Sequence, residues 1–285
     1  MNHCSKLFEI SEEISNFSSQ KEIQIASEFI IAHNDSGEIK IYSIIKNSII
    51  YQETNISAFA WLNSTSISTP ILAILSNSTL KLITFVDHID EVIPFDTTNR
   101  LAAFSIQKLN DNCSILCEFN LQFTFKSFVP FDINSLVILD DQDTLHQFSL
   151  FPDGLYSIKS CRANGCSSFT FSGLYLAGQS TGNIHFWTSN LNYICSTPVS
   201  GTTLCSVSSD RFAVINNDEK NAELLIVDSA NSNAKNEKVE LKEQGPTDFI
   251  SICEDGKVLS KPQDATLITR SYYIPLFIKG KEIFT

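Results

Sequence analysis

The stretch "GLYLAGQSTGNIHFWTSNLNYI", Gly173 to Ile194, decides the fold of this chain. Its apolar residues fall in two short runs, Leu174 to Ala177 and Ile184 to Trp187. The residues between the runs are Gly, Ser, Thr, Gln and Asn. Two short apolar runs around such a turn are typical of a β-hairpin. The fold therefore depends on whether this hairpin is a single feature or one copy of a repeated unit.

The hairpin pattern recurs along the chain. It is repeated at 29–44, 71–85, 136–150 and 212–228, with a further pair of strands predicted at 101–119. The first apolar residues of the outgoing strands are Ile39, Leu80, Leu145, Ile184 and Leu224. Three of the intervals are 41, 39 and 40 residues, and the remaining one, 65 residues, is filled in this interpretation by a hairpin at 101–119. A period near 40 with four short strands per unit is the signature of a β-propeller.

Other short apolar segments lie where such a blade requires them. Segments before the hairpins are expected to form innermost strands, at 56–62, 126–131, 166–171 and 202–208. Segments after the hairpins are expected to form outer strands, at 48–53 and 237–242. The 3.6-residue period of a helix is not sustained anywhere. The sequence therefore predicts an all-β fold.

Two of the hairpins resemble a known family. "STGNIHFW" (180–187) and "DSGEIKIY" (35–42) are similar to the strand-turn-strand segment of WD40 repeats, which ends in Trp or another aromatic residue. Trp187 occupies the tryptophan position, Tyr42 replaces it in the first unit, and the Trp-Asp and Gly-His dipeptides of typical repeats are absent. The resemblance implies a propeller that acts as a binding scaffold. It does not carry over the usual buried His–Asp network.

The resulting prediction is a single propeller over residues 1–285 with six or seven four-stranded blades, seven being favoured. The seventh blade would combine 247–261 and 265–271 with an N-terminal strand at 6–10, so that N- and C-terminal strands close the ring and leave no exposed sheet edge. Residues 229–246 are interpreted as a long loop within a blade. Residues 272–285 are interpreted as an extra C-terminal strand or a tail.

The charge balance constrains the partners. Lys and Arg total 20 against 32 Asp and Glu, a formal net charge of −12. Nucleic-acid binders usually carry a basic stripe, and none is visible, so nucleic acid is not an expected partner. A basic peptide or protein subunit suits the charge better, although solubility alone also explains it.

The start of the chain shows no secretory signal pattern, and no run approaches the roughly 18 apolar residues of a membrane span. We therefore expect an intracellular protein, cytoplasmic or nuclear, without a membrane span. The eight cysteines are dispersed and are interpreted as small buried hydrophobic residues. The five histidines are scattered, without the spacing of a metal or catalytic motif. No metal and no cofactor is expected.

Acidic residues gather in the predicted hairpin turns. An Asp in a turn usually stabilises the bend by accepting hydrogen bonds from its own backbone, so no catalytic residue is expected. The same turns would meet on one face of a WD40-type disc, where an acidic rim could bind a basic peptide. The candidate binding residues are Asp35, Asp140, Asp141, Asp143, Asp218 and Glu219. The predicted function is a protein-interaction scaffold within a multiprotein assembly, and the alternative is a glycosidase-like propeller hydrolase with an axial active site.

Overall fold

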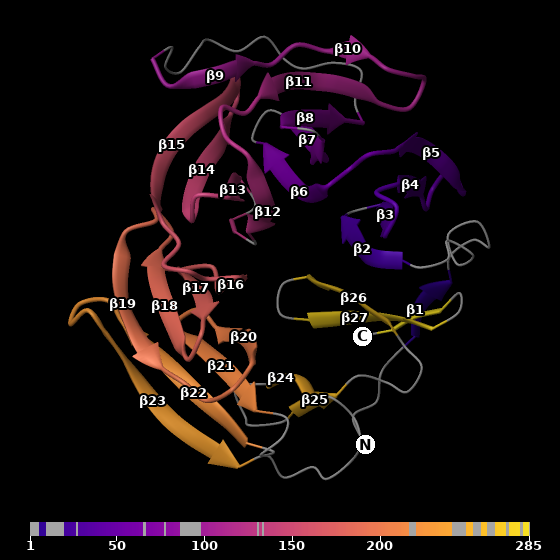
Figure 1. Ribbon diagram of the computed structural model, residues 1–285. Coiled ribbons are helices and arrows are strands. Elements are labelled where there is room, and N and C mark those ends of the chain that lie inside the picture. Colours follow the sequence, from indigo (N-terminus) through magenta and orange to yellow (C-terminus); the bar gives the residue numbers. More distant parts are fainter. Residues whose placement is uncertain are drawn as a thin grey trace. The chain divides into compact units, whose positions relative to one another are not determined.

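The computed structural model is built from β-strands joined by turns and bends (Figure 1), and none of its described residues is helical. It describes residues 6–9, 20–26, 28–64, 67–76, 78–85, 98–129, 131–132, 134–216, 221–240, 249–252, 258–260, 266–271, 274–279 and 282–284. The predicted all-β class is confirmed. The chain divides into two compact units: Met1–Phe8, Pro130–Asp132 and Cys161–Thr285 form one, and Glu9–Val129 and Ile133–Ser160 form the other. The prediction of one domain over residues 1–285 stays a prediction.

The second of these units contains three antiparallel sheets. The first has the order β2-β3-β4-β5, with β2 Gln20–Ala26, β3 Phe29–Asn34, β4 Ile39–Ser43 and β5 Ser48–Glu53. The next has the order β10-β11-β8-β7-β6, with β6 Ala58–Ser64, β7 Ile67–Ser76, β8 Thr79–Thr84, β10 Gln107–Lys108 and β11 Ser114–Asn120. The last has the order β12-β13-β14-β15-β9, with β9 Arg100–Ala103, β12 Phe125–Val129, β13 Ser135–Asp140, β14 Thr144–Phe151 and β15 Gly154–Arg162.

The separate hairpin predicted at 101–119 is wrong. Only the two-residue strand β10 pairs with β11 across the turn at 109–113. β11 itself is the outer strand beside β8, and β9 pairs instead with β15 of the following sheet. The 65-residue interval between Leu80 and Leu145 therefore contains β11, an outer strand of the sheet with β8, and β9, a fifth strand of the following sheet. Alternating hydrophobicity shows that a segment is a strand but does not select its neighbour, which is why the sequence did not reveal this exchange.

In the other unit, residues 168–240 form two four-stranded sheets. One has the order β16-β17-β18-β19, with β16 Ser168–Phe171, β17 Tyr175–Ser180, β18 Asn183–Thr188 and β19 Tyr193–Pro198. The other has the order β20-β21-β22-β23, with β20 Thr203–Ser208, β21 Arg211–Asn216, β22 Asn221–Asp228 and β23 Asn233–Glu240. β16 contacts β20 and β19 contacts β23, so the two sheets lie side by side in the same direction (Figure 1).

Within the stretch 229–246, interpreted as a loop, residues 233–240 form β23, which pairs along its whole length with β22. The outer strand expected at 237–242 overlaps the end of β23. The loop prediction is therefore wrong for 233–240. This strand is at the edge of its sheet, and Asn233, Lys235 and Glu237 are exposed. Charged residues on an edge strand oppose pairing with other chains, and they also give the strand the composition of a loop.

The remaining strands of this unit form two further sheets. β24 Phe249–Ile252 pairs with β25 Val258–Ser260. The order β1-β28-β27-β26 joins N-terminal β1 Lys6–Glu9 to β26 Thr266–Ser271, β27 Ile274–Lys279 and β28 Glu282–Phe284. The stretch 272–285 thus supplies two strands. The number of blades and the closure of the ring stay predictions.

The hairpin turns share a conformation that explains their composition. In four hairpins a turn residue at the start of the outgoing strand has a positive φ. Ser78 (70°), Asp143 (62°) and Gly182 (73°) directly precede that strand, and Gly37 (77°) lies one residue earlier. Residues with a Cβ are strained in this left-handed region, and Gly is not. Asp and Asn tolerate it better than other residues with a side chain.

Replacing Gly182 by Val is expected to lower the free energy of unfolding by about 1–2 kcal/mol, the cost of left-handed backbone for an L-residue. No atom lies within 4 Å of a Cβ at this position, so the cost is conformational and not a clash. Urea unfolding of the G182V variant measures it. Gly182→Asn is the matched control and should lose clearly less, and equal losses in the two variants would contradict a strained turn.

Candidate functional site

A polar side chain occupies the same register position in five hairpins. Each of these residues lies on the outgoing strand of its hairpin. Its partner on the incoming strand is the residue two positions before the end of that strand. The five residues are Lys40, Lys81, His146, His185 and Glu223. Most of their neighbours on the strand are buried apolar residues, for example Leu80 and Leu82 around Lys81. We call these five residues the register residues. They place a polar side chain at the same position of each of these hairpins.

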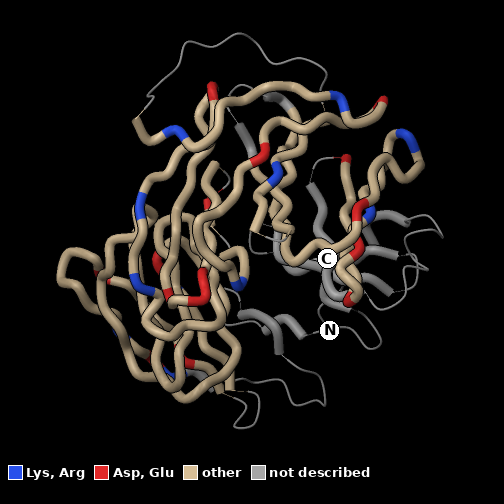
Figure 2. The backbone as a smooth tube through the Cα atoms, turned by 45° about the horizontal axis from the view of Figure 1, so that its top comes forward, with Lys and Arg blue, Asp and Glu red and all other residues tan. Residues whose placement is uncertain are grey.

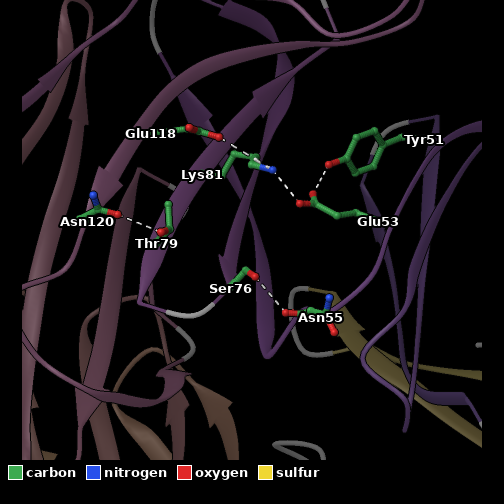
Figure 3. Close-up of polar contacts among 8 residues, drawn as sticks. All are labelled: Tyr51, Glu53, Asn55, Ser76, Thr79, Lys81, Glu118 and Asn120. Carbon is green, nitrogen blue, oxygen red and sulfur yellow. Dashed lines mark hydrogen bonds and ion pairs between the residues drawn. The ribbon is translucent and has the colours of Figure 1, made fainter.

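The register residue Lys81 joins two sheets (Figure 3). Its Nζ lies 2.7 Å from Oε1 of Glu53 on β5 and 3.9 Å from Oε1 of Glu118 on β11. The hydroxyl of Tyr51 donates to Oε2 of the same Glu53, and burial together with this contact raises the pKa of Tyr51. Both carboxylates therefore face one ammonium, and Glu53 also accepts from a neutral phenol. One ammonium between two carboxylates leaves a formal charge of −1, and the ion pair between Lys81 and Glu53 links two neighbouring sheets.

Two further contacts in the same region have the same structural character (Figure 3). They are Ser76 Oγ donating to the carbonyl oxygen of Asn55 at 2.9 Å, and Thr79 Oγ1 donating to Oδ1 of Asn120, also at 2.9 Å. The first connects the chain leading from β5 to the end of β7, and the second connects β8 to β11. These polar groups fix strand ends to one another.

The register residue His146 lies in a chain of polar groups across three strands. Its Nε2 is 2.9 Å from Oδ2 of Asp140 on β13, and its Nδ1 is 2.9 Å from Oγ of Ser160 on β15. The ring of Phe123 stacks on the imidazole, with centroids 3.9 Å apart and an interplanar angle of 8°. Hydroxyl, imidazole and carboxylate in this order are also the components that activate a nucleophilic serine.

The predicted binding residue Asp140 is turned inward, with only 4% of its surface exposed. Its Oδ1 accepts from the backbone N–H groups of Gln142 at 2.9 Å and Thr144 at 2.7 Å. Burial raises the pKa of Asp140, but the hydrogen bonds from His146, Thr144 and Gln142 outweigh it, so that the pKa lies below its ordinary value. This carboxylate stabilises the turn, as turn chemistry predicts.

The other predicted acids are distributed as follows. Asp141 is exposed on the turn between β13 and β14, and Asp143 holds the left-handed position of that turn. Asp35 is exposed on the turn between β3 and β4. Asp218 and Glu219 lie outside the described residues. The structure therefore brings Asp140, Asp141 and Asp143 together on one turn, and the acidic rim as a whole stays a prediction.

The depressed pKa of Asp140 predicts a pH dependence. A carboxyl whose pKa is lower when folded contributes stability above its ordinary pKa, near 3.9, and loses it as the pH falls further. We therefore expect the stability difference between the wild type and the D140N variant to shrink as the pH is lowered from 6 to 3. Urea midpoints at each pH measure it. A difference that is constant with pH would show that the Asp140 carboxylate gains no free energy from these bonds.

Glu223 is a buried carboxylate that the sequence analysis missed. It is 4% exposed, and its Oε1 accepts from the backbone N–H of Ser200 at 2.6 Å and from Ser200 Oγ at 2.7 Å. Asn236 on β23 donates to Oε2. Burial raises the pKa of Glu223, but these bonds outweigh it and hold the pKa below its usual range. Glu223 is the third residue of β22, just as His146 and His185 are the third residues of their strands. This equivalent position is the signal that could have revealed it.

Within the described residues, no three His, Cys, Asp or Glu side chains gather closely enough to hold a metal ion. No helix suited to crossing a membrane occurs in that part of the chain. Lys and Arg are scattered singly along the described backbone and are interspersed with acidic residues (Figure 2). Buried thiols pack as apolar groups in the sheets, and burial raises the pKa of Cys117 to about 12.

No family model and no curated protein sequence matches this chain. Solved structures match it in fold. The C-terminal WD40 domain of Sif2 matches with a TM-score of 0.51 and 11% identity, covering 85% of this chain and 67% of that one. The complex of KlAtg21 with the coiled coil of AgAtg16 matches with a TM-score of 0.52 and 9% identity, covering 78% and 71%.

A candidate 6-phosphogluconolactonase from Bacteroides uniformis is equally similar, with a TM-score of 0.52, 10% identity and coverage of 78% and 71%. The chain thus has the fold of WD40-like β-propeller domains, as the hairpin motifs indicated. Because both binding proteins and an enzyme-like protein have comparable structures, fold alone does not define the activity.

Proposed function

We propose that this chain is an intracellular protein-interaction scaffold and a subunit of a multiprotein assembly. The observation that carries the proposal is the likeness to WD40 domains, one of which is in complex with a coiled coil. Such domains offer rigid surfaces to other proteins. Charged side chains such as Lys81, Glu53 and Asp140 bond to other groups of the chain. We therefore assign partner binding to the turns and the exposed strand faces, which supports a scaffold function.

We further propose that the sheets form seven blades, with β1 joining the C-terminal strands to close the ring. Deleting residues 1–10 would remove β1 from the sheet that also contains β26, β27 and β28. The truncated protein is expected to melt at a lower temperature than the full chain, because a sheet edge loses its hydrogen-bonded neighbour. Differential scanning calorimetry measures this, and equal melting temperatures would contradict closure by β1.

The partner proposed for the acidic turns is a basic segment of another protein. Asp35 and Asp141 are exposed and so can contribute. Charge complementarity of this kind mainly speeds and selects the encounter, and salt screens it.

The test is affinity purification of the tagged chain from its source cells at low and moderate salt, with quantitative mass spectrometry. A stoichiometric set of partners is expected, with a basic member lost at the higher salt. The D35N/D141N double variant is the matched control and should lose that member at low salt as well. A protein that purifies alone and monomeric under every condition would contradict the scaffold function.

A hydrolase is the second candidate, and the chain of Ser160, His146 and Asp140 is the observation that favours it. A serine activated in this way reacts covalently with a fluorophosphonate probe, losing fluoride to form a phosphonyl ester. If the chain is a hydrolase, the probe labels Ser160 in the wild type and not in the S160A variant. If it is a scaffold, the probe labels neither protein. We expect the second result, because Asp140 accepts hydrogen bonds within its turn and Phe123 covers one face of the imidazole ring of His146.

A further inference from the structure

Two short strands show that the outer edge of a sheet in this fold accepts a further strand (Figure 1). β9 pairs with Gly154, Leu155 and Tyr156 of β15 and so becomes the fifth strand of its sheet. β10 pairs with β11 and is the fifth strand of the sheet that contains β8. In both cases a short extended segment covers part of an edge that a four-stranded sheet would leave open.

Two further outer strands carry polar or charged groups along the edge. On β5 the carbonyl oxygen of Ile50 accepts from Nδ2 of Asn110 at 3.3 Å, and the strand ends with Glu53. β23 contains two Lys and two Glu residues. Coverage by another segment and charged side chains are both usual means by which natural sheets prevent pairing at an edge.

β19 differs from the other outer strands that the structure describes between residues 20 and 240. It is the last strand in the order β16-β17-β18-β19, so no fifth strand of the described chain covers it. Its residues are Tyr, Ile, Cys, Ser, Thr and Pro, without a charged side chain. An uncovered and uncharged edge is the kind of surface to which an extended chain adds as a strand.

The ladder between β18 and β19 identifies the backbone groups that face this edge. The N–H of Val199, directly after β19, donates to the carbonyl oxygen of Gly182 at 3.0 Å. Because backbone groups alternate in direction along an antiparallel strand, those of Thr197 point toward β18 and those of Ser196 and Pro198 point away. Ser196 is exposed, and it offers an N–H donor and a C=O acceptor to an added strand. Pro198 has no N–H and so limits the pairing at its end of the strand.

The charge of the chain favours one kind of occupant for the edge. The formal net charge is −12, so a second copy of the chain or an acidic segment would be repelled. β19 has no basic side chain that would attract a carboxylate. An extended segment is most easily formed by β-branched residues such as Val and Thr.

We propose that the edge of β19 binds an extended segment of a partner protein, which adds as a fifth strand and is rich in β-branched residues without acidic ones. The proposal rests on the proposed scaffold function and names one way in which a partner is held. It is separate from the acidic turns, which would attract a partner by charge and not by backbone pairing.

The first test is fluorescence anisotropy with the labelled nonapeptide Lys-Thr-Val-Thr-Val-Thr-Val-Thr-Lys. The matched peptide has the same side chains but N-methyl groups on its inner residues, which removes the backbone donors that a strand needs. The unmodified peptide should bind at least tenfold more tightly, and a peptide with Glu in place of every Thr should bind least. Equal binding of the unmodified and N-methylated peptides, or no binding of either, would overturn the proposal.

Variants assign the binding to β19. Ser196→Pro removes the outward N–H and should weaken binding of the Thr/Val peptide about tenfold, the effect of one lost backbone hydrogen bond. Ser196→Ala keeps the N–H, is the matched control and should leave the affinity unchanged. Pro is tolerated on an edge strand where its nitrogen faces away from the ladder, so similar melting temperatures are expected for the two variants. Equal affinities of S196P and S196A would place the binding elsewhere and overturn the proposal.

Sedimentation tests the alternative occupant, a second copy of this chain. The wild type and the S196P variant should both sediment as monomers. A wild type that is a dimer, together with an S196P variant that is a monomer, would assign the edge to self-association and overturn the proposal.

The purification experiment separates this inference from the proposed function. If S196P and S196A retain the same stoichiometric partners and the Thr/Val peptide does not bind, the proposal for β19 fails while the scaffold function stands. If no partner is found with the wild type or with either variant, the scaffold function itself fails.

Discussion

Replacing Phe212 by Ala is expected to lower the free energy of unfolding by about 3–5 kcal/mol, the usual cost of removing a buried aromatic ring. Phe212 on β21 is fully buried, and its ring lies 5.5 Å from that of Phe186 on β18. The two residues belong to a cluster shared by the sheets β16–β19 and β20–β23, so the cavity would open between two blades. Since domains are stable by only about 5–15 kcal/mol, this loss is a large fraction of the total.

Guanidinium unfolding followed by tryptophan fluorescence measures the effect, because Trp187 lies on the same strand as Phe186. Leu174→Ala is the matched control: its side chain is 52% exposed, so the loss should stay within about 0.5 kcal/mol. A loss below 1 kcal/mol in the F212A variant would show that Phe212 is not packed between two sheets. The result thus tests whether adjacent hairpins are stacked as blades.

The repeat of hairpins could be predicted from the sequence because its signals are local. Gly37 and Gly182 stand at left-handed turn positions, and alternating apolar residues follow each of them. Both strands predicted at 173–194 are present, as β17 and β18, and they pair as a hairpin. Turn chemistry and period-2 alternation depend on neighbouring residues alone, so no knowledge of the tertiary structure is needed.

The candidate site was less predictable because the direction of a turn side chain depends on hydrogen bonds that the composition does not show. Asp140 and Asp141 are adjacent and alike in sequence, yet the first is buried and accepts two backbone N–H groups while the second is exposed. Glu223 was overlooked for the opposite reason. It lies in a strand, where its carboxylate is satisfied by Ser200 and Asn236 from neighbouring segments.

The exchange of strands between blades is the feature that the sequence concealed most completely, and Gly154 provides its test. Gly154 begins β15 and is paired with Ala103 of β9. A Cβ at this position would lie 2.3 Å from the backbone carbonyl oxygen of Ala102, a contact that real structures do not tolerate. The carbonyl cannot rotate away as a side chain would, because it belongs to the paired strand. Glycine is therefore required by the close approach of β9.

Gly154→Ala is expected to cost about 2 kcal/mol and to detach β9 from β15, since overpacking of this kind typically costs 1–3 kcal/mol. Gly154→Val should lower the free energy of unfolding only slightly more than Gly154→Ala, because the Cβ that both residues carry makes the clash. Detachment would break the ion pair between Arg100 Nη1 and Asp153 Oδ2, now 3.0 Å long, and expose the bond after Arg100 to trypsin. Limited proteolysis with mass spectrometry should then show faster cleavage there than in the wild type.

Arg100→Gln is unsuitable as a control because it removes the cleavage site, so Ile158→Ala serves instead. Ile158 is on the same strand and 45% exposed, and its loss should leave cleavage after Arg100 unchanged. If G154A were as stable and as resistant to trypsin as the wild type, β9 could not lie against β15. Residues 101–119 would then be free to form the separate hairpin that their sequence suggests, and the 65-residue interval would hold a further blade.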